Sequence, residues 1–597
     1  MTEHARQSQS SGDLATTSRS AWIFSLCLTV SLVLLVLLGL SPHYEGADLY
    51  GGNSDDVRAT MVASGIGSPA GPSDDLLYSN RLIGRVLCKL YTARPNVPWY
   101  GVYLTVCHLL AHFLICFAWC RVSGNWKLRL AIFSFSLAMG SYHWTALQFT
   151  TTSTLLAIAG TSLLASSLIQ EASSKREKPY ACRALCGWAC VILAGMIRWH
   201  AALMMGIVLG PVMLLLAAWV WKRTAAWNHV AIAVIGLSTM FGLRTWSEEQ
   251  WRSRPDWSEF KRFDYPTSNL INNRHVTSLF FDYETLSEDV QATLDSVGWS
   301  HNDAKVLNHW LYFDEKIFSF EAISRVNTAL TSISVSWSKW LKTILSAVRL
   351  FATDPLSLLV VLLSLAILAT GCGSVRAVGL LVWCVAATLA AFLYLFMKLP
   401  HHVLYPIASS AFFGTLIVSE GSRALRKRGV NSSDSPRIRN RLAAVLLSAA
   451  VLVAAYRTWH HYRLAQSGVR LRAEFLEIVE KLEKGPNHIY IIVLQFPFQR
   501  VSPYDTMHDW KDWHFLYTDG EVRSPRYYAF LKEHGIDDLT EALYSDRRVK
   551  LITIELKMQM LTEFLREHRG VETDYSIERQ LPSITVFQLD PKKSIWE

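Results

Sequence analysis

The sequence predicts a mainly α-helical membrane protein, a polytopic transmembrane helical bundle with a small α/β domain at its C-terminal end. Of the 597 residues, 51% are hydrophobic and only 18% are charged. Apolar runs of membrane-spanning length recur from the N-terminal region to residue 457. Beyond that point, short apolar runs alternate with helical patterns, which is typical of a soluble α/β domain.

The chain divides into three predicted parts. Residues 1–20 are polar and Ser-rich, which indicates a disordered N-terminal segment. Residues 21–457 form the membrane part, with about eleven spans, and residues 458–597 form the α/β domain. The expected spans are 21–40, 99–119, 129–147, 150–169, 184–199, 201–221, 228–244, 355–371, 377–397, 403–419 and 441–457.

Basic residues in the short loops set the predicted orientation. These loops are Arg121–Arg129, Lys175–Lys178, Lys222-Arg223 and Arg423–Arg441. They fall on one side of the bundle, which the positive-inside rule makes cytoplasmic. The N-terminus then lies in the cytoplasm, while the loops 41–98 and 245–354 and the C-terminal domain lie outside the cell membrane. Because the net charge of +9 is concentrated in such loops, we expect no nucleic-acid partner.

An adjacent pair of carboxylates, Asp55 and Asp56, lies in the first external loop. A carboxylate close to lipid is costly, so it is expected to be either fully solvated or functional. In the structural interpretation, Ser54 caps a short helix that runs from Asp55 to Ser64 and stops at Gly65. In the functional interpretation, the loop folds back over the membrane and one of the two carboxylates serves catalysis.

The same loop contains a predicted amphipathic helix, residues 76–91. Its apolar positions recur at helical spacing, so it is expected to lie in the membrane interface. The second acidic pair, Asp74-Asp75, is expected in its first turn behind a Ser73 cap. The cationic face, expected to point toward lipid headgroups, carries Arg81, Arg85 and Lys89.

Two groups of cationic residues occur where predicted spans meet the outside. Arg198 and His200 lie at a turn between two spans, where an arginine can bind a phosphate in bidentate fashion or snorkel to the interface. Lys398, His401 and His402 surround a proline that opens a helix, and they suit either a lipid-linked phosphate or ordinary headgroup contact.

The second external loop is rich in tryptophan, and aromatic rings can stack on sugar rings as well as form interfacial belts. Trp299 precedes a helix start at Ser300. Asp303 is expected to cap that helix, with binding of an acceptor as the alternative.

The layout resembles the GT-C superfamily of membrane glycosyltransferases, which have a similar number of spans and an acidic residue or pair in the first external loop. Asn53-Ser54-Asp55-Asp56, the amphipathic stretch 76–91 and the exported C-terminal domain carry the resemblance. More narrowly, Asn80–Gly84, Trp99-Tyr100 and Gly298–Asp303 are similar to motifs of multi-pass bacterial envelope proteins.

The resemblance implies a polyprenyl-phosphate sugar donor and an envelope glycan, lipid or protein as acceptor. Asp55 or Asp56 would be the general base, and Trp299 and Asp303 would bind the acceptor. The donor phosphate would be bound by Arg198, His200, Lys398, His401 and His402. The resemblance implies no definite cofactor. A divalent cation at Asp55 or Asp56 is the one candidate, and the sequence shows no ligand set for it.

Two other functions remain open at this stage. A transporter or flippase of envelope lipids or glycolipids would need ionisable residues within the membrane, and His108 and His112 share one helix face there. A non-catalytic membrane protein that only anchors the C-terminal domain is the third interpretation, although eleven spans exceed what an anchor requires.

Overall fold

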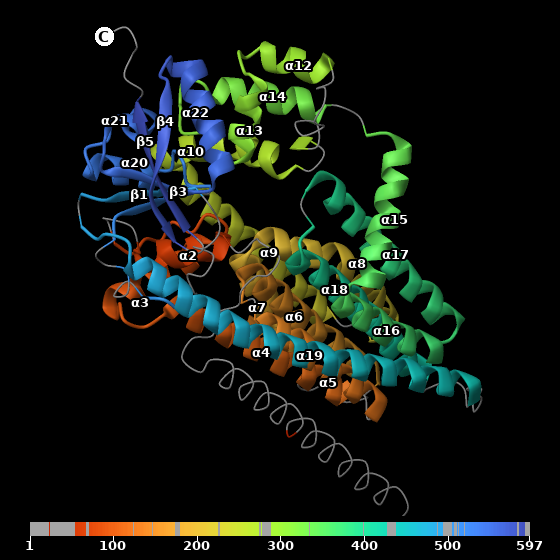
Figure 1. Cartoon of the computed structure of the whole chain (residues 1–597). Helices are drawn as coiled ribbons and strands as arrows, with labels where there is room; N and C mark the ends of the chain where they lie inside the picture. Colours follow the sequence, from red (N-terminus) through yellow and green to blue (C-terminus); the bar gives the residue numbers. More distant parts are fainter. Residues whose placement is uncertain are drawn as a thin grey trace, which may run out of the picture.

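The structure is a computed structural model of the whole chain (Figure 1). It describes Ile23 and residues 54–66, 71–122, 125–145, 147–173, 180–224, 227–273, 276–277, 288–332, 335–397, 399–426, 437–485, 487–493, 504–506, 510, 513–518, 520–581 and 584–591.

The apolar helices form one bundle, which occupies the lower part of Figure 1. Small residues let neighbouring helices approach closely, as is common in membrane bundles. A side chain on Gly160 would lie 2.5 Å from the carbonyl oxygen of Gly187 in the adjacent helix. The bundle helices are α4 (Trp99–Val122), α5 (Trp126–Thr145), α6 (Phe149–Ser173), α7 (Tyr180–Ile197), α8 (Trp199–Thr224), α9 (Trp227–Arg252), α16 (Pro355–Thr370), α17 (Gly373–Phe396), α18 (His401–Arg426) and α19 (Arg437–Glu480).

Seven of the described helices are long and apolar enough to cross a membrane: α4, α6, α8, α9, α17, α18 and α19. An eighth span results if α16 and the preceding α15 (Trp337–Thr353) count as one bent span. The prediction of a multi-pass helical membrane protein is therefore confirmed. Of the other predicted spans, α7 is a shorter apolar helix, α5 is not among the seven, and 21–40 lies outside the described residues apart from Ile23.

The chain bends by 86° between α15 and α16, at Asp354. The Asp354 carboxylate accepts a hydrogen bond from the backbone N–H of Ser357 at 2.8 Å and so caps α16. It also accepts the hydroxyl of Tyr405 at 2.9 Å, which joins the bend to α18. Pro355 at the first helical position favours this start.

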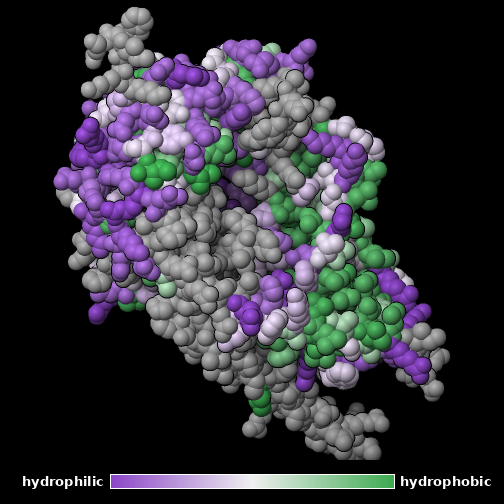
Figure 2. Space-filling model, viewed as in Figure 1, coloured by the Kyte–Doolittle hydropathy of each residue, from purple (hydrophilic) through white to green (hydrophobic). Residues whose placement is uncertain are grey.

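Hydrophobic side chains gather on the surface over α15 to α18, whereas the part of the molecule above them is mostly hydrophilic (Figure 2). Trp337, Leu345 and Leu381 are among the exposed apolar side chains of this region. A surface of this kind is stable in contact with lipid.

Helices of the predicted second external loop and the C-terminal elements form a layer above the bundle, called the extramembrane layer below (Figure 1). The loop contributes α10 (Pro255–Asn272), α12 (Glu288–Asp295), α13 (His301–Asn308) and α14 (Phe320–Thr331) in addition to α15. Ser300 and Ser319 cap α13 and α14 because their hydroxyls accept the N–H groups of Asp303 and Ala322.

The C-terminal region forms a five-stranded mixed sheet in the order β2-β1-β3-β5-β4. β1 is parallel to β2 and β3, and β5 is antiparallel to β3 and β4. In register, Ile491 pairs with Leu516 and Leu551. This confirms the small α/β domain. Its elements are β1 (Ile489–Ile492), β2 (Phe515–Tyr517), α20 (Pro525–Glu533), α21 (Leu539–Ser545), β3 (Val549–Thr553), α22 (Glu555–Arg569), β4 (Thr573–Leu581) and β5 (Ile584–Pro591).

The second external loop and the C-terminal domain share one hydrophobic core. Phe263 of α10, Leu307 of α13 and Ile323 of α14 belong to the same buried cluster as Ile491 and Leu551 of the sheet. The two segments are separated along the chain by α16 to α19, yet they form one folded layer. The boundary predicted at residue 458 falls inside α19, which runs without a break from Arg437 to Glu480.

The first external loop contains two helices, and one of them begins later than predicted. α2 (Ser54–Ser64) matches the expected short helix and is followed by Gly65 at φ 83°. α3 is Arg81–Ala93, capped by Asn80, so the predicted start at residue 76 is wrong. The prediction also put Arg81 toward headgroups, whereas it is buried and pairs with Asp74 at 2.6 Å.

Candidate active site

Helix α2 lies between the bundle and the extramembrane layer (Figure 1). Val57 and Met61 belong to the buried cluster that includes the sheet residues. Val62 and Ala63 belong to the core of the bundle. The first turn of α2, which carries both candidate carboxylates, is therefore held at the boundary between the apolar and polar parts of the molecule.

Asp56 points into the bundle and is only 2% exposed. Its Oδ1 accepts hydrogen bonds from the Tyr100 hydroxyl at 2.9 Å and from the Phe149 backbone N–H at 3.0 Å. Its Oδ2 is buried and has no hydrogen-bond partner among the described residues. Burial raises the pKa of Asp56 to about 8, although the two hydrogen bonds oppose the shift. Near neutral pH this carboxyl group is therefore mostly protonated.

Asp55 lies in a different environment from its neighbour. Its side chain is 33% exposed, and its carboxylate is 3.6 Å from Arg58 and 3.6 Å from Arg198. Two cations therefore face Asp55 from different parts of the chain, one a turn along α2 and the other at the junction of α7 and α8.

Aromatic rings hold both arginines in place. Tyr78 and Phe149 are stacked, with ring centroids 6.1 Å apart and an interplanar angle of 8°. The Arg198 guanidinium lies 4.6 Å from the Phe149 centroid and 5.0 Å from the Tyr78 centroid. Arg58 lies 5.0 Å from the Tyr78 centroid. Cation–π contacts of this kind restrict the positions of both charges.

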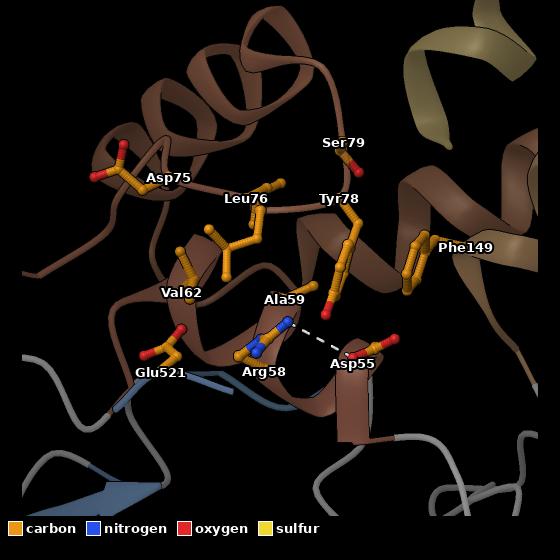
Figure 3. Close-up of a pocket in the computed structure, with 11 residues that line it drawn as sticks. Asp55, Arg58, Ala59, Val62, Asp75, Leu76, Tyr78, Ser79, Phe149 and Glu521 are labelled. Carbon is orange, nitrogen blue, oxygen red and sulfur yellow. Dashed lines mark ion pairs between the residues drawn. The ribbon is translucent and has the colours of Figure 1, made fainter. Parts of the chain in front are cut away.

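A small pocket opens beside these residues (Figure 3). Its free volume of about 10 Å³ has room for one water, so a substrate must widen it. Asp55 lines this pocket but Asp56 does not. The lining comes from α2, from the turn before α3, from α6 and from the C-terminal domain: Asp55, Arg58, Ala59, Val62, Asp75, Leu76, Leu77, Tyr78, Ser79, Phe149 and Glu521.

The structure brings some of the predicted phosphate-binding residues together and separates others. His402 lies within electrostatic reach of Arg198 and Asp55, whereas Nδ1 of His401 lies 3.5 Å from Asp354 at the bend before α16. His200 is exposed, close enough to Arg198 to sense its charge. Lys398 lies outside the described residues.

Trp299 and Asp303 lie in the core of the extramembrane layer. Trp299 is 2% exposed and donates its indole N–H to the carbonyl of Ile317 at 3.0 Å. Asp303 is fully buried, completes a capping box with Ser300 and accepts a hydrogen bond from His568 at 2.8 Å. The capping interpretation of Asp303 is thus confirmed. Neither residue lines the pocket, and their role in acceptor binding stays a prediction.

One described cluster has the composition of a metal site. Atoms of Asp303, Glu567 and His568 lie within 4.8 Å of one another, but His568 already bonds Asp303, and Ser300 bonds Glu567. At Asp55, two arginines supply the positive charge that a cation would bring. The divalent cation stays a prediction, and no step below depends on it.

Several site residues were not identified from the sequence. Tyr78, Phe149 and Glu521 line the pocket but come from separate segments, and no local pattern links them. Asp264 of α10 lies within electrostatic reach of Arg58 and Asp55, and burial raises its pKa. Only the tertiary fold brings these groups together.

The fold and this site describe a multi-pass membrane protein with a small pocket, lined by charged and apolar side chains, at the boundary of its apolar bundle. No family model matches the sequence, and no curated protein matches it. Among solved structures, the chain is similar to ArnT from Cupriavidus metallidurans bound to undecaprenyl phosphate, with a TM-score of 0.40, 12% identity and coverage of 94% of this chain and 97% of that one. For ArnT in the apo state, the values are 0.34, 11%, 95% and 98%. The backbones of this chain and ArnT differ too much for residues to be matched one by one. The candidate site is therefore defined by the geometry of this chain alone.

Proposed function

We propose that this protein is an integral membrane glycosyltransferase of the GT-C type. It would transfer a sugar from a polyprenyl-phosphate donor to a hydroxyl group of an envelope glycan, lipid or protein. The observation that carries the proposal is the pairing of Asp55 with Arg198, at 3.6 Å, where the apolar bundle meets the polar layer. A lipid-linked sugar needs such a boundary, because its prenyl chain is apolar and its sugar is polar.

Asp55 is the proposed general base, because it lines the pocket and can reach an acceptor. It takes the proton of the acceptor hydroxyl as that oxygen attacks the anomeric carbon of the sugar. The bond between the anomeric carbon and the phosphate oxygen breaks, and the polyprenyl phosphate leaves with the electron pair. Charge and protons balance, and no nucleotide is required.

Arg198 is the proposed partner of the leaving phosphate. The ring stack of Tyr78 and Phe149 fixes its guanidinium, and a fixed cation stabilises developing negative charge without reorganisation at the moment of reaction. His402 lies within electrostatic reach of Arg198 and is the next candidate for this role. Asp56 is a positioning residue, because it joins α2 to Tyr100 of α4 and to the start of α6.

We propose that the site lies on the non-cytoplasmic side. α4, α6, α8 and α18 begin close to the site, within one residue of Tyr100, Phe149, Arg198 and His402. The same helices end near the basic segments that the positive-inside rule assigns to the cytoplasm. A donor in the outer half of the bilayer would thus meet the site directly.

Lipid transport is supported less well. Its evidence was the pair His108 and His112 on α4, and both side chains are fully buried. His108 forms a 2.8 Å hydrogen bond with Thr152 of α6, which is a helix–helix contact.

The test is transfer by membranes that contain the protein, incubated with radiolabelled undecaprenyl-phosphate-linked hexoses and pentoses. We expect the label to move to a membrane acceptor while undecaprenyl phosphate is released. Arg198→Gln should lower the rate about 10²-fold, because the leaving phosphate loses a fixed cation. Arg252→Gln, on an exposed residue of α9, is the matched control and should keep the wild-type rate. Label that crosses the bilayer but stays on the donor would support a flippase and contradict the proposal.

A further inference from the structure

We infer that the C-terminal domain forms the acceptor side of this active site, with Gly520 positioning Arg58 and Glu521 binding hydroxyl groups of a carbohydrate acceptor. The inference rests on the proposed function and extends it to a part of the chain far from Asp55 in sequence. Four observations support it, namely the approach of Arg58 to Gly520, the place of Arg58 in the pocket, the place of Glu521 and the anchoring of their segment.

Arg58 approaches the backbone of the C-terminal domain closely at Gly520, whose positive φ favours glycine. Gly520 has φ +71°, and a side chain on it would lie 2.3 Å from Nη1 of Arg58. No real Cβ is found that near another atom, so any larger residue would displace the guanidinium. Gly520 thereby leaves the space that the Arg58 guanidinium occupies.

Arg58 also links this contact to α2, the helix that carries the proposed base. Arg58 belongs to α2, lies 5.0 Å from the centroid of the Tyr78 ring and forms the ion pair with Asp55. A shift of Arg58 would change the electrostatic surroundings of the proposed base. Arg58 therefore couples the C-terminal domain to Asp55.

Glu521 lines the pocket opposite Asp55, and Arg58 lies between them (Figure 3). Its side chain is 13% exposed, and its carboxylate forms an ion pair with Arg526 at 3.7 Å. A partly exposed carboxylate of this kind can accept hydrogen bonds from a sugar's hydroxyl groups. Because Arg198 is the proposed partner of the donor phosphate, we assign Glu521, which lies across Arg58 from Asp55, to the acceptor.

The segment that carries Glu521 is firmly anchored. Val522 is buried in the core shared by the sheet and the second external loop. Arg523 adopts φ 68°, an uncommon value for a residue with a side chain, and its guanidinium lies 4.1 Å from the Phe263 centroid. It also donates a hydrogen bond to the carbonyl of Asp314 at 3.1 Å. These contacts hold Gly520 and Glu521 against the pocket.

The experiment measures transfer from the undecaprenyl-phosphate sugar that the wild type uses best, with a membrane extract as the acceptor. For Glu521→Gln we expect an acceptor KM about tenfold higher at an unchanged kcat, which corresponds to one hydrogen bond to a charged group. For Gly520→Ala we expect kcat to fall about tenfold because Arg58 moves. Gly535→Ala is the matched control, since Gly535 has φ +67° in the same domain but open space around it. Glu533→Gln, on an exposed residue of α20, is the control for charge.

A second readout uses undecaprenyl phosphate alone and follows the thermal shift that it causes in the purified protein. Glu521→Gln and Gly520→Ala should keep this shift, and Arg198→Gln should lose it. An unchanged acceptor KM in Glu521→Gln, with an active wild type, would overturn the inference and leave the proposed function standing. Loss of the lipid-induced shift in Glu521→Gln would also overturn it. A wild-type protein that transfers no sugar would contradict both the proposed function and this inference.

Discussion

Asp55 and Asp56 are adjacent residues with opposite surroundings. Asp55 is partly exposed between two arginines, whereas Asp56 is buried and accepts hydrogen bonds from Tyr100 and Phe149. The sequence predicts an acidic pair at the membrane boundary. It does not predict which carboxylate faces the pocket, because that depends on α4 and α6, which follow α2 by many residues.

The buried carboxyl group makes the stability of the protein depend on pH. Its pKa is about 8 in the folded state and 3.8 in an ordinary aspartate. As the pH rises from about 4 to about 8, the unfolded chain loses this proton and the folded chain keeps it, so stability falls through this range. We expect the melting temperature of the purified protein to decrease from pH 5 to pH 8.5, and Asp56→Asn to show a smaller decrease.

Asp289→Asn, on an exposed residue of α12, is the control for this measurement and should keep the wild-type slope. If wild type and Asp56→Asn lose the same number of degrees over this range, Asp56 does not retain its proton in the folded protein.

At the scale of elements, α2 carries the site because it packs on two layers at once. Its length and its stop at Gly65 follow from local signals in the sequence. The start of α3 is set by the cap at Asn80, whose side-chain oxygen accepts the N–H of Leu82. The amide of Asn80 also donates to the Leu243 carbonyl of α9, a tertiary contact that the sequence does not reveal.

Removing the contact of α2 with the sheet should loosen the site. Met61 is 4% exposed within the cluster that joins α2 to the sheet. We expect Met61→Ala to lower stability by about 2–5 kcal/mol, because it leaves a cavity, and to lower the rate of transfer as well. Protease digestion of the C-terminal domain and the melting temperature measure the effect.

Met61→Leu, which nearly conserves volume, should restore most of the stability. Met397→Ala is the control on a residue that is 49% exposed. A loss of stability in Met397→Ala as large as that in Met61→Ala would contradict a specific role for the contact between α2 and the sheet.

At the scale of the whole molecule, the sequence predicts the class of fold and most of the described spans, because long apolar runs have few alternatives. The C-terminal α/β domain also follows from local pattern, because short apolar runs alternate with helical patterns beyond residue 457. The shared core of the second external loop and the C-terminal domain does not. Phe263 and Ile491 are buried together although α16 to α19 separate them along the chain.

The orientation of this layer is a separate prediction. Fusion of alkaline phosphatase, which is active only outside the cytoplasm, to the C-terminus should give an active reporter. Fusion after Thr224, at the end of α8 opposite the site, should give an inactive one. The reverse pattern would place the site in the cytoplasm and would exclude a donor in the outer half of the bilayer.

The comparison of kcat between Asp55→Asn and Asp56→Asn tests the central claim most directly, with the undecaprenyl-phosphate sugar that the wild type uses as donor. Because Asp55 is the proposed base, we expect Asp55→Asn to lower kcat by about 10²–10⁴-fold. Asp56→Asn keeps an acceptor for the Tyr100 and Phe149 hydrogen bonds and resembles a protonated carboxyl group, so its kcat should stay within about tenfold of wild type. A nearly unchanged kcat in Asp55→Asn, or an equal loss in both variants, would contradict the assignment of Asp55 as the base.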